Sequence, residues 1–288
     1  MSDQAERLRM LMNMQKRQMK IVTVTSGKGG VGKSSLALNM CIALNRFGRR
    51  ALIIDTDFGF SNIDVMLGVR TKYDLMDVID GRKEIGEIIE TGLEGVQFIS
   101  GGSGVYELTK LGPLQLMGIV DKVLSLESVC DTIIFDTGAG INDNTMRLIH
   151  AGDDTILVTT PEPTSVVDAY ALLKIVNEQG VHPNVSLVLN KVEDKREAVS
   201  VMDGLVRIVE KNTEVKMKKL GVISRDPFML SAVKKQVPIL VSHPQCAAST
   251  DINQIVSAFL DIPVPERKKP GLAGFLDRFI LRSDMTKE

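Results

Sequence analysis

The stretch SGKGGVGKSS, residues Ser26 to Ser35, decides the fold because it follows an apolar run and precedes a segment with helical periodicity. It matches the pattern G-x-x-x-x-G-K-[ST] with Gly27, Gly32, Lys33 and Ser34. Such glycines let successive backbone amides point at phosphate oxygens, backed by the positive end of the following helix. Lys33 would neutralise the β- and γ-phosphates, and the Ser34 hydroxyl would ligate Mg²⁺. The stretch therefore predicts a phosphate-binding loop.

Short apolar runs recur along the chain and are separated mostly by longer segments with helical periodicity. The clearest helical segments cover residues 32–48 and 164–180, and each ends at a glycine. Short continuous apolar strands joined by crossover helices predict a mostly parallel sheet with helices on both faces. Strands are expected at residues 20–25, 50–57, 95–102, 131–137, 154–160, 185–191 and 218–224.

The alternation continues to about residue 260, so we predict a single doubly wound α/β domain over residues 20–260. Two segments do not fit the alternation. One is an N-terminal arm, residues 1–19. The other is residues 261–288, which begin with the proline-rich hinge DIPVPERKKPG and continue into an amphipathic segment.

Composition narrows the class of protein. The chain of 288 residues is 44% hydrophobic with a formal net charge of −1, so no nucleic-acid partner is expected. No apolar run is long enough to span a membrane, and the polar N-terminus lacks an apolar signal core. Cys41, Cys130 and Cys246 are scattered and lie among apolar residues, as is typical of reduced core cysteines. We expect a soluble cytoplasmic protein.

A second lysine, Lys28, stands in a loop that needs only Lys33. The form KGGVGKSS resembles the deviant Walker A loop of the MinD/ParA family, the SIMIBI class of nucleotide switches. In that family the earlier lysine reaches across a two-fold interface to phosphates bound by the partner subunit. The resemblance implies an ATPase that dimerises with ATP, with Lys28 and Lys33 both catalytic. It implies a nucleotide held by Gly27, Gly29, Gly30, Val31, Gly32, Lys33, Ser34 and Ser35.

The resemblance covers roughly residues 20–260 and gives roles to acidic residues. IIDTDFGFSNIDVMLG looks like the family's first switch segment, in which Asp55 contacts Mg²⁺ through water and Asp57 orients or deprotonates the attacking water. A carboxylate at a strand's carboxyl end suits this chemistry, although Asp57 could instead cap a helix or turn. IIFDTGAG resembles a Walker B strand ending in Asp136. The implied metal ligands are Ser34, Asp55 and Asp136.

The base of the nucleotide is expected at the end of VSLVLN, where Asn190 stands where the family reads adenine. An Asn amide can pair with the N6 and N7 atoms of adenine. Lys191 and the backbone near Pro227 would flank the base. ATP in preference to GTP rests on Asn190 and on the resemblance.

The tail GLAGFLDRFILR places apolar side chains at helical spacings of three and four, with basic residues nearby. Such a pattern is typical of an interfacial membrane helix, and the family's MinD branch has a similar tail. A helix docked on the protein's own core is the alternative. The predicted membrane residues are Leu272, Phe275, Leu276, Phe279 and Ile280.

The arm MSDQAERLRMLMNMQKRQMK resembles the flagellar branch of the family, the FlhG proteins, also called YlxH or FleN. Its matching residues are Asp3, Gln4, Ala5, Leu8 and Arg9. In that branch the arm stimulates the GTPase FlhF, and Gln4 is the polar residue that would enter the FlhF site. A solvated extension without a partner is the plainer alternative.

The leading hypothesis is an ATPase switch, with Mg²⁺ as cofactor, that dimerises, binds the inner face of the cell membrane and regulates flagellar number and placement. Its expected partners are an FlhF-type GTPase, flagellar switch-complex (C-ring) proteins and membrane lipids. The alternatives are a MinD-type division-site regulator, a ParA-type DNA segregation protein, an iron–sulfur protein of the same superfamily, and a module that binds nucleotide only structurally. The arm argues against MinD, the charge against ParA, and the scattered Cys130 and Cys246 against a cluster.

Overall fold

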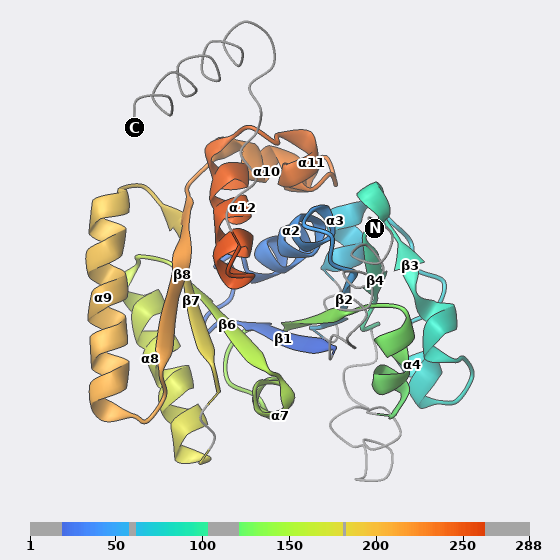
Figure 1. The fold of residues 1–288 in the computed structure, drawn as a ribbon, viewed down its shortest axis with the longest axis horizontal. Coiled ribbons are helices and arrows are strands. Elements are labelled where there is room, and N and C mark those ends of the chain that lie inside the picture. The colour runs from blue at the N-terminus through green and yellow to red at the C-terminus, as the bar shows by residue number, and fades with distance from the viewer. Residues whose placement is uncertain (1–18, 58–61, 103–120, 181–182, 263–288) are drawn as a thin grey trace, which may run out of the picture.

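The computed structural model describes residues 19–57, 62–102, 121–180 and 183–262 (Figure 1). Residues 1–18 of the predicted arm and the predicted membrane helix, and with them residues 3–9 and 272–280, lie outside the described residues. Met19, the last residue of the predicted arm, is instead buried in the core of the domain. The segment after Asp57, residues 58–61, lies outside them as well.

One eight-stranded sheet organises the described part of the chain, in the order β3-β4-β2-β5-β1-β6-β7-β8. Neighbouring strands are parallel except for β3, which runs antiparallel to β4 at one edge. The predicted strands are confirmed, whereas the two-residue β3 was not predicted because it is too short to show a periodicity. The strands are β1 (Lys20–Thr25), β2 (Ala51–Thr56), β3 (Glu90–Thr91), β4 (Gln97–Ile99), β5 (Thr132–Thr137), β6 (Asp154–Thr159), β7 (Val185–Val192) and β8 (Met217–Ser224).

Helices cover both faces of the sheet (Figure 1). The two predicted helical segments are confirmed as α2 and α8, and the glycines after them, Gly48 and Gly180, have left-handed φ values of 80° and 73°. The α-helices are α2 (Lys33–Arg46), α3 (Ile63–Leu67), α4 (Leu75–Ile79), α7 (Asp143–Ala151), α8 (Pro163–Glu178), α9 (Lys195–Asn212), α10 (Pro227–Lys234), α11 (Ile239–Ser242) and α12 (Ala247–Phe259).

Alternating side chains of each strand supply two apolar layers. Ile53 packs on one face with α2, α3, α10, α11 and α12, while its neighbours Leu52 and Ile54 pack on the other face beside α4. Helices α7, α8 and α9 cover that second face over β6 and β7. Every residue of α2 from Leu36 to Leu44 is buried, because α2 lies between the sheet and α11 and α12.

Because the strands are parallel, the loops that follow β1, β2 and β5 all lie at the carboxyl ends of the strands, which we call the carboxyl edge of the sheet. The phosphate-binding loop follows β1, which lies between β5 and β6, and Asp55 and Asp136 pair with each other across β2 and β5. The first strand begins, and the last helix of the domain ends, at the amino ends of the strands, which we call the amino edge. Lys20, the first residue of β1, places its Nζ 4.6 Å from the ring of Phe259 at the end of α12.

We predict that Phe98→Ala, in the core beside β2, lowers the free energy of unfolding by about 3–5 kcal/mol, because it removes a fully buried ring and leaves a cavity. Urea denaturation measures this loss. Val167→Ala, on an exposed position of α8, is the control and should change stability by less than about 0.5 kcal/mol. A loss at Phe98 of similar size to the control would contradict the packing described.

Candidate nucleotide site

The loop after β1 has the backbone that its glycines predict. Gly30 and Gly32 have φ values of 76° and 94°, and Gly32 is the N-cap of α2. A Cβ on Gly32 would lie 2.2 Å from Asn190 Nδ2, and one on Gly27 would lie 2.3 Å from the carbonyl of Asp168. Glycine is therefore required at both positions, and the loop opens the N-terminus of α2 as a phosphate site would.

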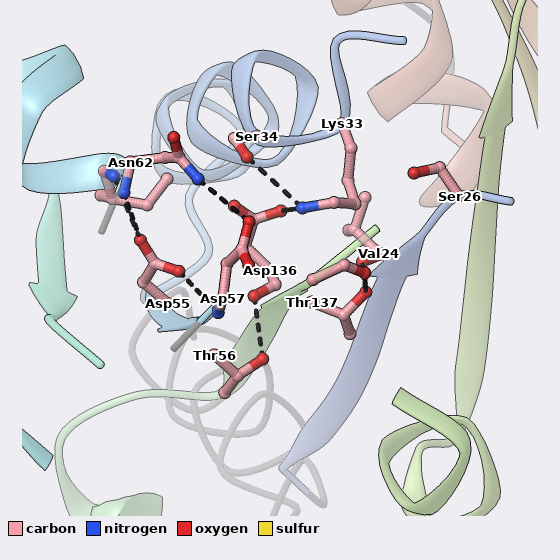
Figure 2. Close-up of polar contacts among 12 residues, drawn as sticks. Val24, Ser26, Lys33, Ser34, Asp55, Thr56, Asp57, Asn62, Asp136 and Thr137 are labelled. Atoms are coloured by element: carbon pink, nitrogen blue, oxygen red, sulfur yellow. Dashed lines mark hydrogen bonds and ion pairs between the residues drawn. The ribbon is translucent and has the colours of Figure 1, made fainter. Parts of the chain in front are cut away.

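Lys33 forms a buried ion pair at the centre of the site (Figure 2). Its Nζ donates to Asp136 Oδ1 over 2.7 Å, with the two side chains 6% and 0% exposed. The same Nζ lies 3.4 Å from Ser34 Oγ. The structure therefore brings together the predicted phosphate lysine, the predicted hydroxyl ligand and one predicted metal carboxylate.

Asp55 and Asp57 belong to a second network beside this pair (Figure 2). Asp55 accepts backbone N–H groups from Asp57 (3.0 Å), Asn62 (2.8 Å) and Ile63 (3.2 Å). Asn62 Nδ2 donates to Asp57 Oδ2 over 3.2 Å. Asp57 thus lies at the rim of the site and does not itself cap α3, whose N-terminal amides are held by Asp55.

Burial of three neighbouring carboxyl groups changes their acidity. Burial, together with the nearby charge of Asp136, raises the pKa of Asp55 to about 6, although its three backbone hydrogen bonds oppose the change. Burial also raises the pKa values of Asp57 and Asp136, and the Lys33 ammonium group opposes both changes. The carboxylates carry more negative charge than Lys33 alone can neutralise.

This excess of negative charge fits a bound cation. Asp136 Oδ2 is buried and has no hydrogen-bond partner among the described residues. Within the same residues, no group of three or more His, Cys, Asp or Glu side chains is placed to hold a metal by itself. Ser34, Asp55 and Asp136 would therefore hold Mg²⁺ together with phosphate and water oxygens, which is the usual arrangement for that ion.

Lys28 points away from this centre. Its Nζ donates to Thr164 Oγ1 over 3.0 Å and lies 3.5 Å from Glu162 Oε2, at the N-terminus of α8. The Lys28 side chain is 40% exposed, against 6% for Lys33. The two lysines of the loop therefore have different surroundings, one buried among carboxylates and one at the surface.

The three residues predicted at the base are arranged differently from one another. Asn190 is buried, donates through Nδ2 to Val31 O (2.8 Å), and accepts from Lys191 N (2.8 Å). Its amide thus braces the phosphate-binding loop, and one N–H and one lone pair remain for a base. Lys191 Nζ donates to Gly30 O over 2.6 Å. Pro227 is the exposed first residue of α10, and its contact with a base stays a prediction.

Sequence reasoning missed Asn62, Glu162 and Thr164. Asn62 lies in the quoted switch segment, immediately before helix α3 and five residues after Asp57. This closeness in the chain could have indicated a contact with the switch carboxylates. No local pattern relates Lys28 to Glu162, because 134 residues separate them in the chain.

The cysteines offer no cluster site within the described residues. Burial raises the pKa of the Cys41 thiol to about 12 and that of Cys130 to about 11. Cys246 is half-buried and caps α12, accepting the backbone N–H of Ser249. The two buried thiols therefore behave as the predicted core cysteines, and Cys246 has a local structural role.

The carboxyl groups predict a specific dependence of stability on pH in protein free of metal and nucleotide. Asp55 keeps its proton to about pH 6 when folded but loses it near pH 4 when unfolded, so this group's contribution to stability falls as pH rises from about 4 to about 6. The total change is roughly 3 kcal/mol.

Asp55→Asn should remove this part of the dependence. We expect the wild type to lose stability relative to the variant between pH 4.5 and pH 7 by about 2–3 kcal/mol, measured by urea denaturation in EDTA. Asp203→Asn, at the surface of α9, is the control. Parallel curves for wild type and Asp55→Asn would contradict the raised pKa.

Comparison with known proteins places this site in a family. The ParA family model, described as "NUBPL iron-transfer P-loop NTPase", matches residues 17–260. The antiactivator FleN of Pseudomonas aeruginosa is 31% identical, covering 90% of this chain and 93% of FleN. The flagellum site-determining protein YlxH of Helicobacter pylori is also 31% identical, covering 97% of this chain and 99% of YlxH.

A solved structure shows the same fold. The septum site-determining protein MinD from Pyrococcus horikoshii, determined in complex with Mg-ADP, superposes with a TM-score of 0.67 at 22% identity, covering 84% of this chain and 96% of MinD. Members of this family are ATPases. The chain belongs to the ParA/MinD family of P-loop NTPases.

Proposed function

We propose that this protein is an ATP-dependent switch that regulates the number and placement of flagella. Two relatives at 31% identity, FleN and YlxH, support the flagellar assignment, and the alignment with YlxH covers 97% of this chain. The predicted arm and tail together are much longer than the few residues that this alignment leaves uncovered. The alignment with YlxH therefore includes residues of the regions where we predicted an arm and a tail.

The single observation that carries the switch mechanism is the position of Lys28. A lysine that served its own nucleotide would lie beside Lys33, yet Lys28 lies at the exposed N-terminus of α8. From there a modest side-chain movement would present its ammonium group to a second subunit. ATP would hold two subunits face to face, because each Lys28 would complete the charge around the phosphates of the other.

The remaining groups divide the work of hydrolysis. Lys33 would bind the β- and γ-phosphates, and Ser34, Asp55 and Asp136 would hold Mg²⁺, which offsets charge on the transferred group. Asp57 lies at the rim, where its carboxylate would orient or deprotonate a water molecule. Hydrolysis would remove the γ-phosphate and with it the reason for the two subunits to associate.

The output of the switch would come from the end segments. Paired tails in a dimer would bind lipid much better than one, so ATP would control attachment to the inner face of the cell membrane. The arm would stimulate an FlhF-type GTPase, and other surfaces would recruit C-ring proteins. In the described residues, no helix is both long enough and apolar enough to cross a membrane.

A division-site regulator is the second candidate, because MinD shares the fold. The identity with the solved MinD structure, 22%, is enough to show the fold alone. The predicted arm, which the MinD branch usually lacks, favours the flagellar assignment.

Lys28→Ala should bind ATP with nearly unchanged affinity but fail to dimerise, and its turnover should fall by roughly 10²-fold or more, since a cation supplied from a partner contributes at least that much. Light scattering with ATP measures the mass, and phosphate release measures turnover. Lys174→Ala, an exposed lysine on α8, is the matched control. Normal ATP-dependent dimers of Lys28→Ala would rule out the cross-subunit role.

A peptide of residues 1–20 should raise the GTPase rate of purified FlhF, and the Gln4→Ala peptide should not. The reason is that a polar side chain inserted into a GTPase site can position the attacking water. Steady-state phosphate release with each peptide, and with no peptide, measures the effect. An inactive wild-type peptide would leave the ATPase assignment in place but favour the division-site alternative.

A further inference from the structure

Strand β8 is the last strand of the sheet, and no described strand pairs with its outer side. Just after β8, Arg225 directs its N–H inward, to Val192 O of β7 over 2.7 Å. The preceding residue, Ser224, directs its N–H the other way, to Asp251 of α12 over 2.8 Å. These directions alternate along a strand, so Val222 also presents its N–H and C=O outward. Among the described residues, none outside the sheet forms a hydrogen bond with either group of Val222.

Two lysines that could shield the outer side of β8 are held away from it. Edge strands often carry lysines, whose charge opposes pairing with another strand. Here Lys218 Nζ donates to Asp261 Oδ1, just after α12, over 3.0 Å. Lys219 Nζ donates to Asp203 Oδ1 of α9 over 2.6 Å. Because α12 and α9 cover opposite faces of the sheet, the two side chains diverge and leave the backbone after them unshielded.

A groove of about 490 Å³ follows the open part of β8, which lies between α9 and α12 (Figure 1). An added strand needs backbone partners along its middle and apolar contacts on both faces, because its side chains alternate between them. The groove offers both, since each helix contributes one apolar wall beside the strand. Its apolar lining comprises Val199 and Met202 of α9, Leu220 and Val222 of β8, and Ile255 and Ala258 of α12.

The exposed charges that line the groove are cationic. The side chains of Lys195 and Lys219 are 58% and 50% exposed. Asp251 is the one carboxylate among the described residues that line it, and it is 4% exposed and accepts from both Lys195 and Ser224. Each of the two ammonium groups keeps N–H donors beyond its own ion pair. An occupant that carries a carboxylate is therefore favoured over a basic one.

We propose that the outer side of β8 binds an extended segment of a partner protein, which adds a strand to the sheet. The segment is apolar at alternate positions and carries at least one carboxylate. Its backbone exchanges hydrogen bonds with Val222, its apolar side chains fill the groove, and its carboxylate pairs with Lys195 or Lys219. The surface is separate from the phosphate-binding loop, because β6 and β7 lie between β8 and β1.

Two other occupants fit this groove less well. A second copy of the chain, pairing through its own β8, would bring Lys218 and Lys219 of that copy toward the cations already present. A lipid acyl chain would fill the apolar walls but would leave the outward N–H and C=O of Val222 without partners. An acidic, extended peptide satisfies the backbone, the walls and the charges together.

The first test selects peptides by phage display of random ten-residue sequences on the immobilised full chain, with Val222→Pro as the counter-selection. Proline removes the outward N–H and leaves the bonds to β7 in place, and Gly221 before it accommodates the proline ring. We expect the peptides that bind only the wild type to have apolar residues at alternate positions and an Asp or Glu. Urea denaturation checks that the variant is folded.

The second test uses the most enriched peptide with a fluorescent label, titrated by anisotropy. Two forms are N-methylated, one at odd and one at even positions, so that in an added strand only one form loses the N–H groups that face β8. That form should bind about tenfold or more weakly, and the other should bind nearly as the parent peptide does. Val199→Glu, on the wall of the groove, should weaken binding similarly, while Val167→Glu, exposed on α8, is the matched control.

Four results would each overturn the proposal. They are a selection that yields no peptide specific for the wild type, equal losses for the two methylated forms, unchanged binding by Val199→Glu, and binding only after residues 263–288 are deleted. The last result would show that the chain's own tail occupies the groove. Because the methylated peptides and Val199→Glu leave β8 unaltered, the test holds even if Val222→Pro does not fold.

Discussion

The buried ion pair between Lys33 and Asp136 is the interaction on which the site depends. Removing two charges from water is costly, and here two further carboxylates, Asp55 and Asp57, lie beside the pair. One ammonium group cannot neutralise three carboxylates, so the ionised site carries a net negative charge that a bound cation would balance. A nucleotide phosphate would compete with Asp136 for Lys33, and the carboxylate released in that way would need a cation of its own. The proposed Mg²⁺ would supply that cation.

Topology places these charges together. Asp55 and Asp136 end adjacent parallel strands in register, and Lys33 begins the helix that follows the strand on the other side of β5. Small changes in register would separate the groups by several ångströms, yet β1, β2 and β5 are largely buried on both faces, which fixes their register strongly. The hydrophobic core thus sets the electrostatics of the site, because a shift of β5 would bury the wrong side chains on both of its faces.

The sequence was sufficient for the features that are local or periodic. The loop pattern, the buried strands and the helices ending at Gly48 and Gly180 each depend on residues close together in the chain, and the structure agrees with all of them. Contacts between distant segments could not be predicted. The bond between Lys28 and Thr164, the bracing of the loop by Asn190, and the link from Gln236 to Val65 join residues more than 130 positions apart. Such pairs have no pattern in a single sequence, since only the packed fold brings them into contact.

The nucleotide site lies at the carboxyl edge of the sheet, whereas the arm and tail, which we propose as the outputs, adjoin the domain at the amino edge. Helix α2 begins at Lys33 in the nucleotide site, and its 14 residues span roughly 21 Å through the core. It packs in one apolar cluster with α12, whose end meets the first residue of β1 where the arm and tail begin. Buried contacts between α2 and α12 thus form a continuous packed connection between the nucleotide site and the amino edge.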